Sequence, residues 1–128
     1  MNLLLDTHLL LWSAGRDTMM SEAADALIRD ENNALWFSAA SIWEVAIKRG
    51  LGRADFRTDP GVLRAGLLAN GYTELPITGS HCARILDLPA IHNDPFDRIL
   101  IAQSRAEGME LITADTRVAQ YGGPIRRV

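Results

Sequence analysis

The chain has 128 residues, of which 48% are hydrophobic and 23% are charged. This length fits one domain and excludes a two-domain enzyme, and the apolar content is enough to bury a core, which excludes a wholly disordered chain. The formal net charge is −3, so the protein does not coat nucleic acid or an anionic membrane by bulk charge. Any contact with a polyanion must be local.

The cysteine content and the first residues bear on where the protein works. Cys82 is the single cysteine, so no internal disulfide forms, and the sequence has no cysteine or histidine spacing of the zinc-site type. The apolar run that opens the sequence is broken at Asp6 and His8, well short of a signal or membrane-spanning segment. We therefore expect a cytoplasmic protein with no membrane association.

Short aliphatic runs alternate with helical patterns along the chain. The elements predicted in order are strand 2–5, helices 9–15 and 22–29, strand 34–38, helices 39–49 and 62–69, strand 72–75, helices 80–88 and 95–107, strand 109–113, helix 115–121 and an edge strand at 125–128. This alternation is typical of βα units. We expect one α/β domain over residues 1–128, with a mainly parallel sheet and helices on both faces.

Four acids lie at the predicted strand-to-helix junctions. Asp6 follows the first strand, Glu44 lies in the helix after the second, Asp97 lies in the first turn of a helix, and Asp115 follows the strand at 109–113. The carboxyl ends of parallel strands share one edge of the sheet, where open α/β folds bind their ligands. These acids can therefore meet although they are distant in sequence.

Helix capping is an alternative explanation for each acid taken singly. Aspartate is a preferred N-cap residue, and the helix dipole favours acids in the first turn. Asp94 with Asp97, and Ser41 with Glu44, have the spacing of a capping pair. Glu44 and Lys48 have the i,i+4 spacing of a surface ion pair.

The apolar neighbours of these acids favour a second explanation. Glu44 lies within the apolar segment 42–47, Asp97 precedes the segment 99–102, and Asp6 follows three leucines. Carboxylates at the rim of a core are desolvated, and two of them 4 Å apart repel by about 4 kcal/mol at an effective dielectric of about 20. Such a cluster needs a cation or shared protons.

Oxygen ligands without histidine or cysteine select Mg²⁺ or Mn²⁺, which retain water and bind substrate phosphates. The chemistry implied is hydrolysis of a phosphodiester, in which the ion lowers the pKa of a bound water and neutralises charge on the phosphate oxygens.

Four segments resemble the PIN-domain nucleases, and most closely the VapC-type toxins of bacterial toxin–antitoxin pairs. They are LLLDTH at 3–8, SAASIWEVAIK at 38–48, HNDPFDRILIAQ at 92–103 and LITAD at 111–115. The segments follow the order of the family and span nearly the full sequence. The resemblance implies a three-layer α/β/α fold and a divalent metal, with endoribonuclease activity. It also implies a small VapB-type antitoxin, a homodimer, and a hetero-tetramer or octamer with the antitoxin.

The resemblance also implies roles for particular residues. The acidic quartet of the family corresponds to Asp6, Glu44, Asp97 and Asp115, which would bind the metal and carry catalysis. Thr7 is expected to support Asp6 by a hydrogen bond. Asp94 is either a fifth acid of the metal site or the N-cap of the helix that presents Asp97, and we favour the cap. Val118 and Ser104 depart from the family pattern in ways that bear on packing and not on the quartet.

Several basic and aromatic residues have two explanations each. Lys48 and Arg98, with Arg49, Arg53 and Arg57, could bind RNA phosphates beside the acids or form a solvated face. The three histidines are scattered, and we expect structural roles for them. The three tryptophans are expected in the core or at an interface.

Two other functions are weighed against the nuclease. The first is a protein-binding module of the same fold, in which the acids act only as helix caps. The second is a phosphatase or phosphotransferase with Asp6 as nucleophile, but Asp6-Thr7-His8 lacks a second acid two residues on, which disfavours it.

Overall fold

The computed structural model describes residues 1–15 and 18–128. Its strands form one sheet in which every neighbouring pair is parallel. The order across the sheet is β3 (Thr73–Leu75), β2 (Ala34–Ser38), β1 (Asn2–Leu5), β4 (Glu110–Thr113) and β5 (Ile125–Arg127). The prediction of an α/β fold with a parallel sheet is confirmed, and the last strand lies at an edge as expected.

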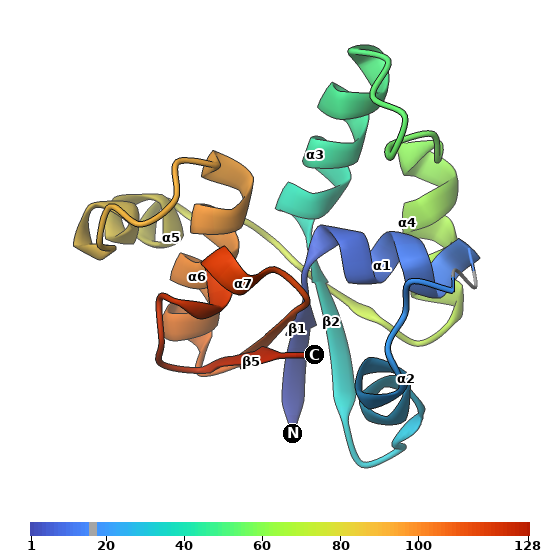
Figure 1. Cartoon of the computed structure of the whole chain (residues 1–128), viewed down its shortest axis with the longest axis horizontal. Coiled ribbons are helices and arrows are strands. Elements are labelled where there is room, and N and C mark those ends of the chain that lie inside the picture. Colours follow the sequence, from blue (N-terminus) through green and yellow to red (C-terminus); the bar gives the residue numbers. More distant parts are fainter. Residues whose placement is uncertain (16–17) are drawn as a thin grey trace.

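Helices cover both faces of the sheet, as Figure 1 shows. One face carries α1 (Thr7–Gly15), α2 (Glu22–Arg29) and α4 (Pro60–Ala69), and the other carries α5 (Gly79–Ala83), the 3₁₀-helix η1 (Arg84–Asp87), α6 (Pro95–Glu107) and α7 (Thr116–Ala119). The helix α3 (Ala39–Gly50) follows β2 directly and contacts both α4 and α6. No described helix has the length and apolar character needed to span a membrane.

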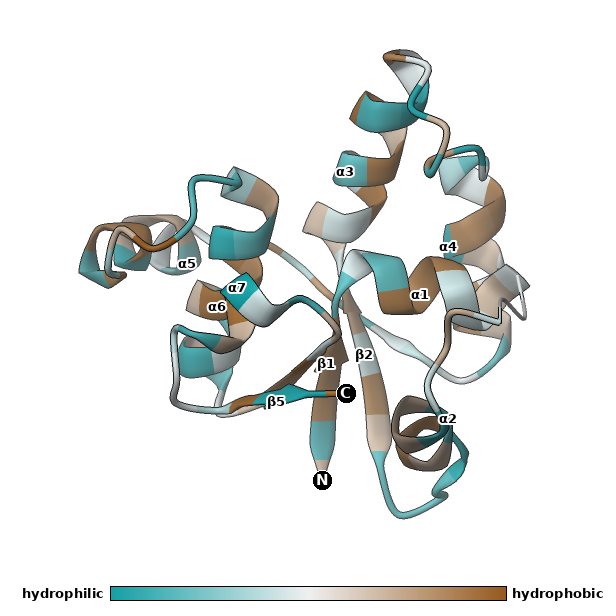
Figure 2. Cartoon of the chain, viewed as in Figure 1, coloured by the Kyte–Doolittle hydropathy of each residue, from teal (hydrophilic) through white to brown (hydrophobic). Residues whose placement is uncertain are grey.

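Strand β1 is buried on both faces because it lies at the centre of the sheet. Leu3 and Leu5 pack into the core beneath α1 and α4, whereas Leu4 packs into the core beneath α6. A strand of this kind needs a continuous apolar run in place of alternation. Figure 2 shows the consequence: β1 is mostly brown, whereas the edge strand β5 is mostly teal.

Two local predictions are wrong. A single helix over 80–88 is not formed, because the chain changes from α5 to η1 and Leu88 is extended before Pro89, as the residue before a proline prefers. Ser41 and Glu44 are not a capping pair. The N-cap of α3 is Ser38, whose side chain accepts from the Ala40 N–H, so Ser41 lies inside the helix.

The strand order places a ligand crevice between β1 and β4. The chain leaves β1 towards β2 and β3 on one side, then returns across the sheet to β4 and continues outward to β5 on the other side. Connections that depart in opposite directions from two adjacent parallel strands leave a crevice outside their carboxyl ends. The residues that follow β1 and β4 are Asp6 and the Ala114–Asp115 pair.

Candidate active site

Asp6 lies at the centre of this crevice, and only 6% of its surface is exposed. Its Oδ1 accepts from the Leu9 N–H in the first turn of α1 (3.0 Å), and its Oδ2 accepts from the Thr113 hydroxyl at the end of β4. Burial raises the pKa of Asp6, although both hydrogen bonds act to lower it. Asp6 is therefore a carboxylate whose charge the protein alone does not fully stabilise.

Glu44 projects from the second turn of α3 and is 3% exposed. The Thr7 hydroxyl donates to its Oε1 (2.6 Å), and Lys48 Nζ donates to its Oε2 at 2.5 Å. Thr7 Oγ1 also lies 2.9 Å from Ser41 Oγ. The expected support from Thr7 thus goes to Glu44, and the pair with Lys48 is mostly buried where a surface pair was expected.

Asp94 and Asp97 lie at the start of α6. Asp94 is the N-cap: its Oδ1 accepts from the Phe96 N–H (2.9 Å), and its Oδ2 lies 3.6 Å from Lys48 Nζ. Asp97 Oδ2 lies 2.7 Å from His92 Nε2. Burial raises the pKa of Asp97 to about 6, assisted by the charges of nearby acids and opposed by the hydrogen bond with His92.

Asp115 is the N-cap of α7. Its Oδ1 accepts from the Arg117 N–H (2.8 Å), and its Oδ2 lies 3.6 Å from the Arg117 guanidinium. Partial burial acts to raise the pKa of Asp115, but the hydrogen bonds and the charge of Arg117 outweigh it, so the pKa is lowered. Asp115 is therefore ionised more readily than Asp6 or Asp97.

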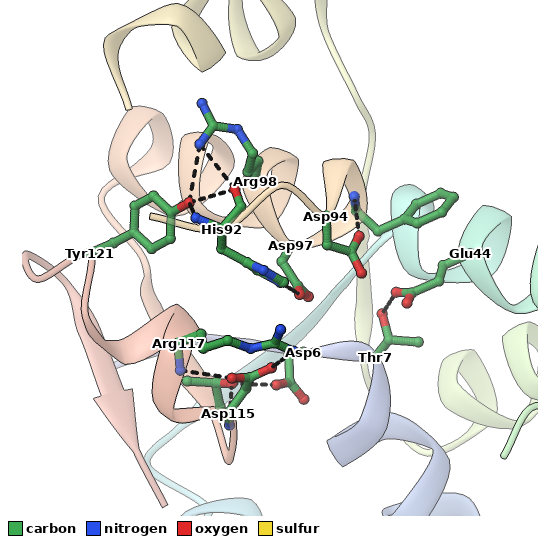
Figure 3. Close-up of polar contacts among 12 residues, drawn as sticks. Asp6, Thr7, Glu44, His92, Asp94, Asp97, Arg98, Asp115, Arg117 and Tyr121 are labelled. Atoms are coloured by element: carbon green, nitrogen blue, oxygen red, sulfur yellow. Dashed lines mark hydrogen bonds and ion pairs between the residues drawn. The ribbon is translucent and has the colours of Figure 1, made fainter. Parts of the chain in front are cut away.

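These acids share one small pocket of about 140 Å³. Figure 3 shows Asp6, Glu44, Asp94, Asp97 and Asp115 approaching it from different elements. The residues that line it lie after β1, in α1 and α3, in the loop after α3, and in or just before α6 and α7. They are Asp6, Thr7, His8, Glu44, Lys48, Arg53, Asp94, Asp97, Asp115 and Arg117. Carboxylates outnumber cationic side chains in this lining. The pocket is therefore electronegative although Lys48, Arg53 and Arg117 also line it.

The structure thus brings together the four acids of the predicted quartet, with Thr7, Asp94 and Lys48. Arg98 does not line the pocket. Its guanidinium donates instead to backbone carbonyls and to the Tyr121 hydroxyl.

Four residues in or beside the site were not predicted from the sequence: His8, His92, Thr113 and Arg117. His92 carried a usable signal, because it lies five residues before Asp97, in the loop that leads into the same helix. Thr113 did not, because its contact with Asp6 depends on the pairing of β1 with β4.

Helix capping accounts for part of this arrangement. Asp6, Asp94 and Asp115 each accept from a backbone N–H in the first turn of a helix, as the capping alternative predicts. Glu44 is buried and Asp97 is half-buried, both within helices, and their hydrogen bonds are to side chains. Two such carboxylates in the same pocket as the three caps are more than capping requires.

The donor set fits a hard divalent cation. Carboxylate oxygens are the ligands that Mg²⁺ and Mn²⁺ prefer. Burial is the largest cause of the raised pKa values of Asp6 and Asp97, and the charges of neighbouring acids in the pocket add to it. Donor atoms of His92, Asp94 and Asp97 also lie within 4.8 Å of one another. A divalent cation among these oxygens would relieve the repulsion.

The profile of the PIN domain matches residues 3–124 of the chain. The chain belongs to the PIN domain family. Comparison with curated protein sequences finds no significant match. This PIN domain is similar in fold to VapBC2 from Rickettsia felis (TM-score 0.71, 11% identity, covering 99% of this chain and 98% of that one). It is also similar to VapC20 from Mycobacterium tuberculosis (0.68, 14%, 94% and 95%) and to VapBC-1 from nontypeable Haemophilus influenzae (0.60, 16%, 99% and 98%).

Proposed function

We propose that this PIN domain is a Mg²⁺- or Mn²⁺-dependent endoribonuclease that hydrolyses RNA phosphodiester bonds as a toxin. The observation that supports it most is the convergence of Asp6, Glu44, Asp97 and Asp115 on one electronegative pocket between β1 and β4. The similar fold of VapC20, which is described as a toxin that cleaves the sarcin–ricin loop, supports the substrate class. We place the reaction in the cytoplasm, where Cys82 stays reduced.

The residues divide into those that hold the cation and those that bind the phosphate. Asp6, Glu44, Asp97 and Asp115 would hold the cation, which supplies an activated water and neutralises charge on the phosphate oxygens. Thr113 and the Leu9 N–H orient Asp6, and Thr7 orients Glu44. These fixed hydrogen bonds keep the carboxylates aimed at the pocket before substrate arrives.

Basic side chains beside the acids would attract the phosphates of the RNA backbone to the pocket. Lys48, Arg53 and Arg117 line the same pocket, and cationic side chains supply the attraction for phosphates that a chain of net charge −3 lacks as a whole. The role predicted for Lys48 in substrate binding fits this position. Arg98 is bonded elsewhere, so we now assign it to the support of the loop before α6.

Cleavage of RNA by the purified protein tests this function. Asp6→Asn keeps the shape of the side chain and an acceptor for the Leu9 N–H but removes the charge, and we expect it to lower the rate about a hundredfold or more. Asp59→Asn is the matched control, because Asp59 caps α4 through the Gly61 and Val62 N–H groups and lies outside the pocket. Asp59→Asn should cleave RNA at the wild-type rate. EDTA should abolish cleavage by Asp59→Asn and by the wild type.

Cleavage by Asp6→Asn at the wild-type rate would contradict the catalytic role of Asp6, and cleavage that persists in EDTA would contradict metal dependence. Absence of cleavage by the wild type with Mg²⁺ or Mn²⁺ would contradict the nuclease and favour the protein-binding module with capping acids. The phosphotransferase alternative stays disfavoured, because Asp6-Thr7-His8 lacks a second acid two residues on.

We also propose that a small VapB-type antitoxin neutralises the enzyme and that the enzyme forms a homodimer. Trp43, Ile47 and Leu51 recur every four residues along α3, and their exposed fractions are 56%, 43% and 74%. Exposed apolar side chains on one helix face mark an interaction surface. One protein of similar fold, from Klebsiella pneumoniae, is described as a toxin–antitoxin complex.

Light scattering on the purified chain, alone and with the antitoxin encoded beside it, tests the assembly. A dimer is expected for the chain alone, and a hetero-tetramer or octamer for the complex. A monomer at micromolar concentration would overturn the homodimer.

A further inference from the structure

His92 lies behind Asp97 as seen from the pocket. Its Nε2 is 2.7 Å from Asp97 Oδ2, and its side chain is 9% exposed. Asp97 is among the residues that line the pocket, and His92 is not. Figure 3 shows the histidine ring directed at the Asp97 carboxylate. His92 therefore acts on the pocket through Asp97.

The chemistry of the two groups sets the direction of the hydrogen bond. A carboxylate that binds a cation is deprotonated and can only accept, so His92 Nε2 carries the hydrogen. This bond engages one carboxylate oxygen and restricts rotation about the terminal bond of Asp97. The second oxygen is left for a ligand in the pocket.

The backbone of His92 is itself held by the phenol of Tyr121. The His92 N–H donates to Tyr121 Oη (2.9 Å), and Tyr121 Oη donates to the His92 carbonyl at the same distance. Tyr121 follows α7 and is 29 residues away in sequence. Asp115 is the N-cap of that helix. The same region of the chain therefore supplies one acid of the pocket, Asp115, and supports His92, which contacts Asp97.

Arg98 adds a second anchor to the loop that carries His92. Its guanidinium donates to the Pro89 carbonyl (3.0 Å), the Ile85 carbonyl (3.2 Å), the His92 carbonyl (3.3 Å) and Tyr121 Oη (3.1 Å). Because its guanidinium has four partners inside the protein, Arg98 has a structural role. It follows Asp97 directly in α6, so one helix carries both the acid and the anchor of its supporting loop.

We propose that His92 is a positioning residue that holds Asp97 for a divalent cation, and that Tyr121 and Arg98 hold His92 in place. This inference rests on the proposed function, because the orientation of Asp97 matters only if the pocket binds a cation. A direct bond from His92 to the cation is the competing role, since donor atoms of His92, Asp94 and Asp97 lie within 4.8 Å of one another. The closing experiment separates the two roles.

The test measures Mn²⁺ affinity by calorimetry for the wild type, His92→Ala and His92→Gln. Removing groups that orient metal ligands costs about ten- to a hundredfold in affinity, and we expect this loss for His92→Ala. The amide nitrogen of glutamine can occupy the place of Nε2 and donate, so His92→Gln should recover most of the affinity. Tyr121→Phe keeps the buried ring but loses the anchor, and a smaller loss is expected.

His81→Ala is the matched control for general destabilisation. His81 is also buried, and it contacts Thr78, Gln103 and Glu107 away from the pocket. Its removal should lower the melting temperature but leave the Mn²⁺ affinity unchanged. Electron spin echo spectra of the Mn²⁺-loaded wild type should show no coupling to a histidine nitrogen.

The outcomes separate this inference from the proposed function. A wild type that does not bind Mn²⁺ overturns both. Mn²⁺ binding by His92→Ala as tight as that of the wild type overturns only the positioning role. A histidine nitrogen signal that is lost in His92→Gln overturns it too, because it would make His92 a ligand and exclude His8, which lines the pocket. Equal losses in His92→Ala, His92→Gln and His81→Ala would reduce its role to stability alone.

Discussion

Lys48 is a basic side chain that lies close to two acids of the pocket. Its Nζ lies 2.5 Å from Glu44 Oε2 and 3.6 Å from Asp94 Oδ2, and it packs 4.9 Å from the centre of the Phe56 ring and 5.6 Å from that of Phe96. Burial acts to lower the pKa of Lys48, but the hydrogen bond and charge of Glu44 outweigh it, so the pKa is raised. Lys48 therefore stays charged and partly neutralises the negative charge of Glu44 and Asp94.

Replacing Lys48 by methionine should therefore destabilise the metal-free protein. Methionine keeps much of the apolar stem but leaves Glu44 buried without its counter-ion, and breaking a buried ion pair costs about 3 kcal/mol. Urea unfolding of Lys48→Met, Glu44→Gln and the double variant measures this loss. The double variant should recover part of it, and Mn²⁺ should stabilise Lys48→Met more than the wild type. Equal stability of Lys48→Met and the wild type without metal would contradict this account.

Asp97 makes the stability of the metal-free protein depend on pH. Burial and the charges of Asp94, Glu44 and Asp6 raise the pKa of Asp97 to about 6, from 3.8 for the free side chain. The folded protein therefore binds a proton at Asp97 between these two values, whereas the unfolded chain does not. The stabilisation from that proton is complete below pH 3.8 and is lost as the pH rises to about 6.

We expect the free energy of unfolding of the metal-free wild type to fall relative to Asp97→Asn by about 2 kcal/mol between pH 4 and 6, and to level off near pH 7. Comparison with Asp97→Asn isolates this group from the other acids, since asparagine does not titrate. Urea unfolding at half-unit pH intervals measures the difference. A constant difference between the two proteins across this range would show that Asp97 is not a destabilised acid.

At the scale of elements, α6 presents two acids because of how it begins. Asp94 caps the first turn and Pro95 occupies the first helical position, where its missing N–H costs nothing. Asp97 then follows in the first turn and faces the pocket from the same end. Gly108, at φ 66°, ends the helix in the left-handed conformation that glycine adopts readily.

Two substitutions at Asp94 separate capping from metal binding. Asparagine is as good an N-cap as aspartate, whereas Asp94→Ala loses about 1 kcal/mol. We expect Asp94→Asn to match the wild type in melting temperature and in RNA cleavage, and Asp94→Ala to melt earlier. Loss of cleavage in Asp94→Asn without loss of stability would make Asp94 a fifth acid of the metal site.

Elements with strong terminal signals could be predicted from the sequence, and those without them could not. The start of α6 was predicted correctly because Asp94 and Pro95 both mark it. The helix predicted at 80–88 is instead divided into α5 and η1, and no strong terminal signal within it marks the division. Leu86 is in fact 93% exposed, and Pro89 forces the preceding residue out of the helix.

At the scale of the whole molecule, the strand order assembles the site. Alternation of strands and helices predicts a parallel sheet, and a parallel sheet places all strand ends at one edge. Strands β1 and β4 are neighbours in the sheet, which brings Thr113 to Asp6 although the two are 107 residues apart in sequence. No local sequence pattern predicts this pairing. The sequence therefore predicted the acids that meet, with the help of family resemblance, but not the threonine and histidine that orient them.

The central claim is that Asp6, Glu44, Asp97 and Asp115 form one divalent cation site. Anomalous diffraction from crystals grown with Mn²⁺ tests it most directly. We predict a manganese peak in the pocket between β1 and β4, within coordination distance of carboxylate oxygens from at least two of these acids, and no such peak in Asp6→Asn crystals. A pocket without a peak at saturating Mn²⁺, or with manganese bound only elsewhere on the molecule, would contradict the claim.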